Sequence, residues 1–369
     1  MNNSDEQTAR VERLQRQMER RRIDLAAIAP TANMRYLLGF SPLADERLCL
    51  LLVTPAGTRL VVPELNADQV EARAGVEGVR WSDEAGPGAA LEAALDELGA
   101  EEPGLLAVDA AMRADALLHL QEAARPGRSV DATDLMSSLR MRKSESEIEA
   151  LARAAAQADV AMMAGVETCQ PGVTEREVAQ TIARAFREDG AEEVHATLVA
   201  SGPNGAFPHH QAGDRKLQVG DTIVIDIVAT LDGYNSDITR MVHLGEPSAE
   251  VLEVYETVRE ANRRGRDAAR AGARACDVDQ ATRSVIEEAG YGPAFVHRTG
   301  HGLGMEVHEP PFISATNTRE LEPGMVFSIE PGIYLPGRFG VRIEDIVAVT
   351  EEGPCRCLTG LDRELIVKA

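Results

Sequence analysis

Two similar segments of the chain each carry a pair of acidic residues at matching positions. Residues 217–226 align with residues 321–330, because in both a Leu precedes the final acid by nine positions and a Gly precedes it by six. A second acid, Asp237 or Glu344, comes four residues after a glycine in each segment. Each segment therefore predicts an acid in an apolar strand, a glycine-containing turn and a second acid on the returning strand. Two such hairpins related by a pseudo-twofold axis would direct four carboxylates to one centre.

The strand context makes these carboxylates costly to bury. Asp226 lies in Ile-Val-Ile-Asp-Ile-Val, and Glu330 ends Met-Val-Phe-Ser-Ile-Glu. A buried carboxylate without a partner is unfavourable, and like charges share a buried centre only with protons or cations between them. One such acid would suggest a salt bridge or a strand end, but four in matched positions favour a metal centre.

A histidine between glycines is the fifth candidate ligand. His301 lies in Thr-Gly-His-Gly-Leu-Gly, where small neighbours let backbone and substrate approach the imidazole closely. Four carboxylates and one imidazole form an oxygen-rich donor set with a single nitrogen. Such a set suits Mn²⁺, Co²⁺ or Fe²⁺, and suits Zn²⁺ less distinctively.

The composition excludes some classes of function. The chain has 60 acidic and 38 basic residues, and the net charge of −22 argues against a general nucleic-acid binder. The N-terminal residues are charged and polar, and we identify neither a secretion signal nor a membrane-spanning segment. Five scattered Cys without CxxC spacing suggest reduced thiols. We expect a cytoplasmic protein with small-molecule or peptide partners, no nucleic acid and no membrane.

The hydrophobic patterns predict an α/β (α+β) protein of two domains. Residues 1–138 alternate between helical patterns and short apolar runs, which is typical of a small α/β domain. Ser144 and Glu147 form a capping-box start for the following helix. Residues 139–369 form the second predicted domain. It contains two helices followed by strands, twice over: helices near 144–168, 174–189, 248–271 and 278–289, and strands near 197–201, 222–229, 325–335 and 340–349.

These motifs resemble a known family. Residues 144–369 are similar to the pita-bread catalytic domain of the prolidase, aminopeptidase P and methionine aminopeptidase family, and residues 33–39 resemble part of the N-terminal domain of prolidases and creatinase. Within the family, the chain looks closest to the small bacterial Xaa-Pro dipeptidases. The matching segments are residues 224–227, 233–240, 297–304, 306–310, 327–332 and 340–345.

The resemblance implies a dinuclear metal centre. Asp226 would chelate one ion, His301 and Glu330 would hold the other, and Asp237 and Glu344 would bridge both. The pair of ions, preferably Mn²⁺ with Co²⁺ or Zn²⁺ as alternatives, would activate a water for hydrolysis.

The resemblance also implies roles for residues around the metals. Glu330 would take a proton from the water and help deliver it to the leaving nitrogen. His308 and His209 would contact the substrate, although His209 is followed by His210 where many relatives have Gly. Arg342 would orient Glu344 or bind substrate.

The implied substrate is a peptide with an Xaa-Pro bond. A dipeptidase must read the free C-terminal carboxylate, usually with an arginine. Arg47, in Ala-Asp-Glu-Arg, could project from a loop into a neighbouring subunit's cleft, since homodimers are common in the family. The alternative is a solvated charge cluster on a turn.

Other functions remain open on the sequence alone. The main prediction is an Xaa-Pro dipeptidase, a metallopeptidase. The alternatives are an Xaa-Pro aminopeptidase, a non-peptidase C–N hydrolase such as an ectoine-derivative hydrolase, and a binding protein on the same fold. The five intact ligand positions argue against the binding protein and against a metal-free, creatinase-like enzyme.

Overall fold

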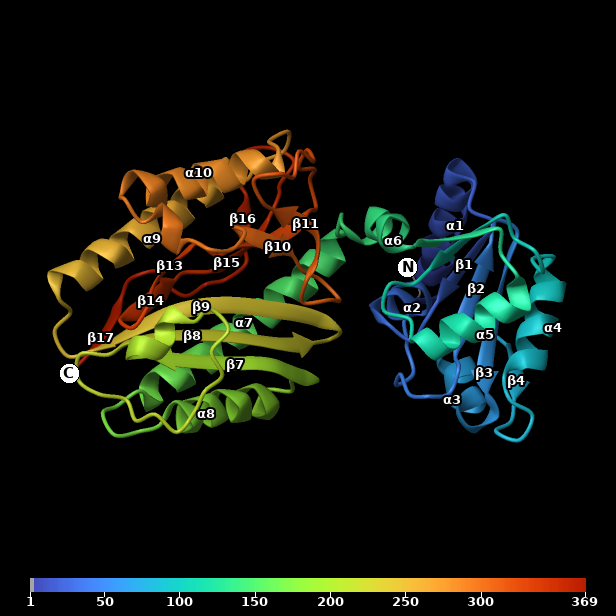
Figure 1. Cartoon of the computed structure of the whole chain (residues 1–369), viewed down its shortest axis with the longest axis horizontal. Helices are drawn as coiled ribbons and strands as arrows, with labels where there is room; N and C mark the ends of the chain where they lie inside the picture. The colour runs from blue at the N-terminus through green and yellow to red at the C-terminus, as the bar shows by residue number, and fades with distance from the viewer. Residues whose placement is uncertain (1–2) are drawn as a thin grey trace. The chain divides into compact units, whose positions relative to one another are not determined.

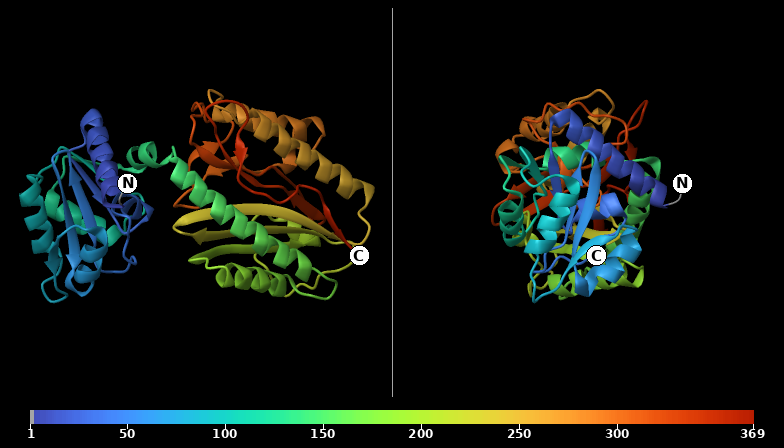
Figure 2. Two further views of the ribbon diagram at one scale, coloured as in Figure 1. Left: turned by 180° about the vertical axis from the view of Figure 1, so that it is seen from behind. Right: turned by 90° about the vertical axis from the view of Figure 1, so that its right-hand side faces the viewer.

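The computed structural model describes residues 3–369 and divides the chain after Arg140 into two compact units. The units are called N-terminal and C-terminal below, and Figures 1 and 2 show the elements of each.

The N-terminal unit is a six-stranded mixed sheet flanked by helices. Its strand order is β4-β3-β2-β1-β5-β6, with antiparallel pairing of β2 to both β1 and β3 and parallel pairing elsewhere. The short apolar runs predicted within residues 1–138 contribute strands, and β1 and β2 are buried along their whole length. The strands are β1 Leu25–Ile28, β2 Leu50–Thr54, β3 Gly57–Pro63, β4 Gly78–Trp81, β5 Leu105–Val108 and β6 Arg128–Asp131; the helices are α1 Asn3–Arg21, α2 Ala32–Leu38, α3 Glu64–Ala74, α4 Gly88–Leu98, α5 Ala114–Ala124 and α6 Thr133–Arg140.

The first half of the C-terminal unit packs two helices against an antiparallel hairpin. Helices α7 (Glu145–Thr168) and α8 (Glu175–Glu188) share an apolar core with the strands, and both lie on one side of the sheet in Figures 1 and 2. The sheet order is β17-β9-β8-β7. Its strands are β7 Glu193–Ser201, β8 Thr222–Leu231, β9 Tyr234–Leu244 and β17 Ile366–Lys368, and a short 3₁₀ helix, η1 Gly202–Ala206, follows β7.

The second half repeats this order of elements, which confirms the predicted fold class. Helices α9 (Ala249–Ala268) and α10 (Ala275–Glu288) precede a five-stranded sheet of order β11-β10-β12-β15-β16 and a separate hairpin, β13-β14. The elements are η2 Gly292–Ala294, β10 Gly300–Gly302, β11 Glu309–Ile313, β12 Val326–Ile329, β13 Gly332–Leu335, β14 Phe339–Arg342, β15 Asp345–Ala348 and β16 Arg356–Cys357.

Local sequence accounts for the element boundaries of the first half. The predicted capping box of Ser144 and Glu147 is confirmed at the start of α7, and Thr174 with Glu177 forms another at the start of α8. Strands β8 and β9 are joined by Asp232-Gly233, both with positive φ (51° and 77°). This is the Asp-Gly turn whose twist matches a tight antiparallel hairpin.

The second hairpin is interrupted, which differs from the prediction. The predicted strands 325–335 and 340–349 are each broken into two, with Glu330 between β12 and β13 and Glu344 between β14 and β15. Pro331 follows Glu330, and proline has no N–H to continue a strand ladder. The acids of the first half therefore lie within continuous strands, whereas those of the second half lie at breaks.

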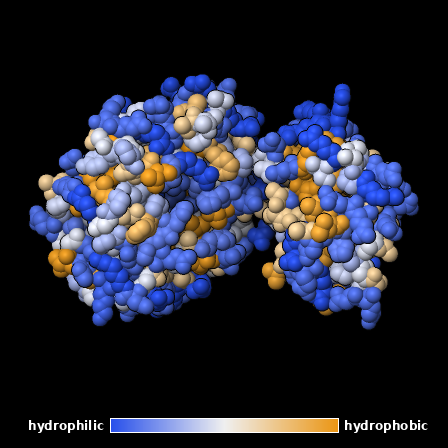
Figure 3. Space-filling view, viewed as in Figure 1, coloured by the Kyte–Doolittle hydropathy of each residue, from blue (hydrophilic) through white to orange (hydrophobic). Residues whose placement is uncertain are grey.

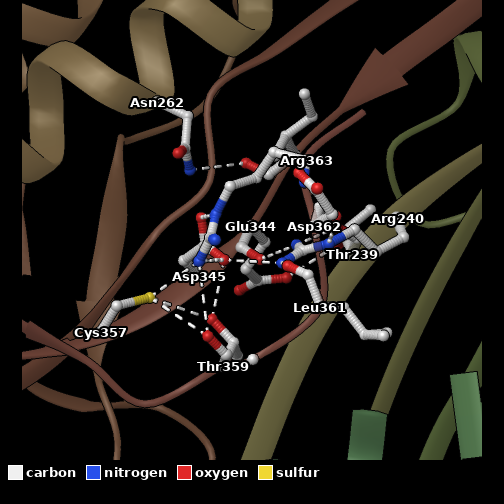
Figure 4. Close-up of polar contacts among 12 residues, drawn as sticks. Thr239, Arg240, Asn262, Glu344, Asp345, Cys357, Thr359, Leu361, Asp362 and Arg363 are labelled. Carbon is white, nitrogen blue, oxygen red and sulfur yellow. Dashed lines mark hydrogen bonds and ion pairs between the residues drawn. The ribbon is translucent and has the colours of Figure 1, made fainter. Parts of the chain in front are cut away.

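A buried charge network ties β9 to β15 and to the C-terminal segment (Figure 4). The Arg240 guanidinium donates to Asp345 at 2.8 Å and to the backbone carbonyl of Glu344 at 2.6 Å, and the Arg240 and Asp345 side chains are 1% and 0% exposed. Arg363 and Thr359 also donate to Asp345. Burial raises the pKa of Asp345, but the two arginines outweigh it and lower the pKa to about 2.

The face of the molecule in Figure 3 is mostly hydrophilic, with apolar residues in separate patches. In the part of the chain that the structure describes, no helix has both the length and the apolar character needed to cross a membrane.

The Arg240–Asp345 network predicts that two aspartate substitutions differ strongly in their effect on the free energy of unfolding. Asp345→Ala leaves the buried charge of Arg240 without its carboxylate partner, so we expect the free energy of unfolding to fall by about 3–5 kcal/mol. Asp68→Ala, in α3, removes an exposed pair with Arg80 and is the matched control, with an expected change within about 1 kcal/mol. Denaturant unfolding of both variants measures the difference. Equal losses would contradict the role of the network.

Candidate active site

Strands β8 and β9 present two of the predicted ligands on one face of the sheet. Asp226 lies opposite Thr239, and Asp237 lies opposite Val228. Directly opposed residues of an antiparallel pair share a face, and so do residues two apart on one strand. The pairing register therefore places both carboxylates on the same side of the hairpin.

The other three predicted ligands come from the second half of the unit and meet this pair. His301 lies in β10, and its Nε2 is 3.3 Å from Glu330 Oε1 and 3.7 Å from Asp237 Oδ2. Ligand atoms of Asp237, His301 and Glu344 all lie within 4.8 Å of one another. Asp226 and Glu330 are slightly more exposed, at 19% and 16% of their side chains. The five side chains thus converge on one centre.

The protonation of His301 indicates that a cation fits this centre. Its Nδ1 is 3.1 Å from the Gly302 carbonyl, which can only accept, so Nδ1 carries the proton and Nε2 a lone pair. Burial lowers the pKa of His301 to about 3, so the ring is neutral. The Nε2 lone pair therefore faces the oxygens of Asp237 and Glu330, an arrangement that a metal ion between them would stabilise.

The pKa shifts of the carboxylates also indicate that a cation fits this centre. Burial raises the pKa of Asp237 and of Glu344 well above the ordinary range, and neighbouring acids raise both further. Burial also raises the pKa of Glu330 to about 7, against the opposing charge of Arg342. A cluster of acids that resists ionisation without a cation is the donor set that a divalent ion requires.

Arg342 links the two halves of the centre. Its guanidinium donates to Asp226 Oδ2 at 2.5 Å, to Tyr334 Oη at 2.7 Å and to Thr239 Oγ1 at 3.2 Å. Thr239 in turn donates to Glu344 Oε2 at 2.8 Å. Arg342 therefore positions Asp226 directly and Glu344 through Thr239.

His297 extends this chain of hydrogen bonds. Its Nδ1 donates to the Arg298 carbonyl at 2.7 Å, so its Nε2 accepts from Tyr334 Oη at 2.8 Å. Burial lowers the pKa of His297 to about 4, which keeps the ring neutral. Tyr334 is thereby held with its oxygen toward Arg342.

The centre opens into a cleft of about 1030 Å³ within the C-terminal unit. His209 and His308 line this cleft, and the ring of His308 packs edge-on against His301 at 4.2 Å between centroids. Both predicted substrate-contacting histidines therefore face the same space as the predicted metal ligands.

A tether that the sequence did not reveal holds the loop carrying His209. The next residue, His210, contacts Glu175 Oε2 at 2.9 Å, and the Gly213 N–H donates to the same oxygen. Ser201 and other donors occupy Oε1. Burial raises the pKa of Glu175, but these hydrogen bonds outweigh it and lower the pKa. In the sequence, Glu175 is only an acid in the first turn of a helix, and no spacing links it to a loop 35 residues away.

Arg47, the remaining predicted site residue, lies in the N-terminal unit. Its guanidinium pairs with Asp83 and Glu46, both at 2.9 Å, beside a small cavity of about 110 Å³. Its assignment to substrate binding stays a prediction.

Comparisons with known proteins agree with this fold. The family model for metallopeptidase family M24 matches residues 149–351, and that for the creatinase/prolidase N-terminal domain matches residues 10–142. A probable dipeptidase PepE of Mycobacterium bovis is 44% identical over 92% of this chain and 91% of its own length. An Xaa-Pro dipeptidase of Pyrococcus furiosus is 36% identical over 97% of this chain and 99% of its own.

A solved structure extends the likeness to three dimensions. The crystal structure of a dipeptidase from Pyrococcus horikoshii OT3 superposes with a TM-score of 0.93 at 39% identity, and covers 97% of this chain and all of that one. A two-domain metallohydrolase is the class that the fold and the carboxylate-lined cleft define. The chain belongs to metallopeptidase family M24.

The glycines beside His301 generate a prediction about metal binding. A Cβ at Gly300 would meet the Ser328 carbonyl oxygen at 1.8 Å, so Gly300→Ala must separate β10 from β12 and displace His301. We expect a lower metal content after purification and a loss of about 1–3 kcal/mol in unfolding free energy. Gly88→Ala, with no atom within 4 Å of its Cβ, is the control. Metal content equal to that of the unsubstituted protein would contradict the prediction.

The Glu175 tether generates a second prediction. Glu175→Gln removes the negative charge and places an amide NH₂ opposite the N–H of Ser201 or of Gly213, which can only donate, so the 207–213 loop should open more often. We expect exchange of the Gly213 amide hydrogen to accelerate by about ten- to a hundredfold. The exposed Glu188→Gln at the end of α8 is the control. Hydrogen-exchange mass spectrometry reports both, and unchanged exchange in the loop would show that the tether is unimportant.

Proposed function

We propose that this protein is an Xaa-Pro dipeptidase that uses two divalent metal ions. The observation that carries the proposal is the convergence of one imidazole and four carboxylates on a cleft large enough for a short peptide. Relatives named as Xaa-Pro dipeptidase and dipeptidase, similar over nearly the whole chain, support the substrate class.

The proposed ligand arrangement follows the family resemblance. Asp226 would hold one ion, His301 and Glu330 would hold the other, and Asp237 and Glu344 would contribute to holding both. We assign residues 139–369 to the catalytic domain and residues 1–138 to the creatinase/prolidase-like N-terminal domain.

The side chains around the centre have distinct tasks in the proposed mechanism. When bound, the ions lower the pKa of a water and polarise the scissile carbonyl. The Glu330 carboxylate accepts the proton of that water and returns it to the leaving nitrogen. The imidazoles of His308 and His209 line the cleft and donate hydrogen bonds to the substrate, while Arg342 keeps Asp226 in place.

The proline ring limits how the scissile bond can be held. The nitrogen of an Xaa-Pro bond carries no hydrogen, so the substrate cannot be held through that N–H. Like every amide leaving group, the proline nitrogen must gain a proton, and Glu330 is the proposed donor. A cleft that contains apolar residues beside polar ones, such as Leu198 and Val228 near the centre, suits the ring.

Finer features belong to the same proposal. The oxygen-rich donor set with one imidazole favours Mn²⁺, with Co²⁺ and Zn²⁺ as alternatives. All five cysteines are free thiols, which is typical of a reducing compartment such as the cytoplasm. We also propose a homodimer, which light scattering of the purified protein would test.

The test combines metal analysis with a substrate panel. We expect two divalent ions per chain and hydrolysis of Xaa-Pro dipeptides in preference to Xaa-Pro-Xaa tripeptides and acetylated diamino acids. Glu344→Ala should lower kcat/KM by more than about a hundredfold, beyond the usual loss for an outer-sphere partner. The exposed Glu351→Ala is the control.

Two outcomes would refute this function. One is preferential cleavage of tripeptides or acetylated diamino acids, and the other is full dipeptidase activity after complete chelation.

A further inference from the structure

Arg298 places an unpaired guanidinium in the cleft. It lines the same cavity as the predicted metal ligands and stacks over the Phe312 ring, with 4.4 Å from Cζ to the ring centroid. Within residues 3–369, no carboxylate or carbonyl accepts a hydrogen bond or forms an ion pair with its side chain. Its charge is nevertheless close to the centre: burial lowers the pKa of His308, and the charge of Arg298 lowers it further.

The backbone on both sides of Arg298 is held in place. Arg283, in α10, donates to the carbonyls of Phe295 at 3.2 Å and His297 at 2.9 Å. On the other side, Thr299 donates its N–H and its hydroxyl to Asp279. Because its neighbours are pinned and its side chain is stacked, the guanidinium is positioned before any ligand arrives.

The other arginines of the cleft already have partners or lie at its edge. Arg342 is occupied by Asp226 and Tyr334, and Arg176 pairs with Asp214 at 2.8 Å. Arg187 is exposed near the end of α8. Arg298 is therefore the cleft arginine that combines partial burial, fixed position and five free donors.

A half-buried guanidinium with free donors is suited to a planar anion, and a carboxylate fits its fork in a bidentate manner. Every linear peptide carries one such group at its C-terminus. We propose that Arg298 binds the C-terminal carboxylate of the dipeptide substrate and thereby sets the preference for dipeptides over longer peptides. This inference rests on the proposed function, because it names the residue that would select substrates whose C-terminal carboxylate lies one residue beyond the scissile bond.

The test compares a free carboxylate with an amide. The metal-loaded protein and the Arg298→Met variant, which keeps a side chain that can stack on Phe312, are assayed on one Xaa-Pro dipeptide and on its Xaa-prolinamide. We expect the variant to raise KM for the dipeptide by about ten- to a hundredfold, with little change in kcat. The effect on the amide should be less than about threefold. Arg298→Lys, which keeps the charge but not the fork, should be intermediate.

A binding measurement separates this inference from the proposed function. Calorimetry should show that proline binds the metal-loaded protein more tightly than prolinamide, and that Arg298→Met removes this difference. Metal content and the thermal midpoint are measured for each variant. Arg264→Met, on the outer face of α9 and paired with Glu260, is the matched control.

The outcomes are distinct. Equal losses on dipeptide and amide, no loss on either, or a selective loss in Arg47→Ala instead of Arg298→Met would overturn the assignment. If no Xaa-Pro bond is cleaved but proline binding still depends on Arg298, the proposed function fails and the carboxylate site stands. If Arg298→Met fails to fold, Arg298→Lys decides by the same comparison.

Discussion

Mutual repulsion among buried carboxylates is the constraint around which the C-terminal unit is built. Asp237 and Glu344 are almost fully buried, face further acids, and resist ionisation for that reason. The neutral His301 directs a lone pair at the same oxygens. Protons or cations must neutralise such a cluster. Because the fold holds the acidic side chains close together despite their repulsion, it is suited to binding cations.

The polar groups that support the cluster hold its members without entering it. Arg342 holds one carboxylate directly and another through Thr239, and its own orientation depends on Tyr334. Below the centre, Arg240 and Asp345 fix the backbone of Glu344 (Figure 4). Except for the one to Tyr334, these hydrogen bonds join residues that are more than a hundred positions apart in the sequence. Both halves of the unit must therefore fold before the centre exists.

The repeated spacing made the ligand set visible in the sequence, because paired hairpins leave the same pattern of Leu, Gly and acid twice. The first hairpin and the cap of α7 followed from local chemistry. The break at Glu330 was missed, although Pro331 was a signal for it. The Glu175 tether and the free guanidinium of Arg298 were beyond sequence reasoning, since each depends on which distant groups are already paired. A count of arginines cannot show that Arg342 has polar partners while Arg298, among residues 3–369, has only the Phe312 ring.

The broken second hairpin has a mechanical consequence. Asp226 and Asp237 sit in strands with an unbroken ladder, so their separation is stiff. Glu330 sits at a break in the ladder, before Pro331, and small rotations there do not strain a sheet. Glu344 also lies at a break, but Arg240 holds its backbone carbonyl. Three of the four acids are therefore held firmly, and the fourth, Glu330, can move enough for the centre to fit ions of different radius. Tolerance for several metals would then originate in the backbone, not in the choice of donor atoms.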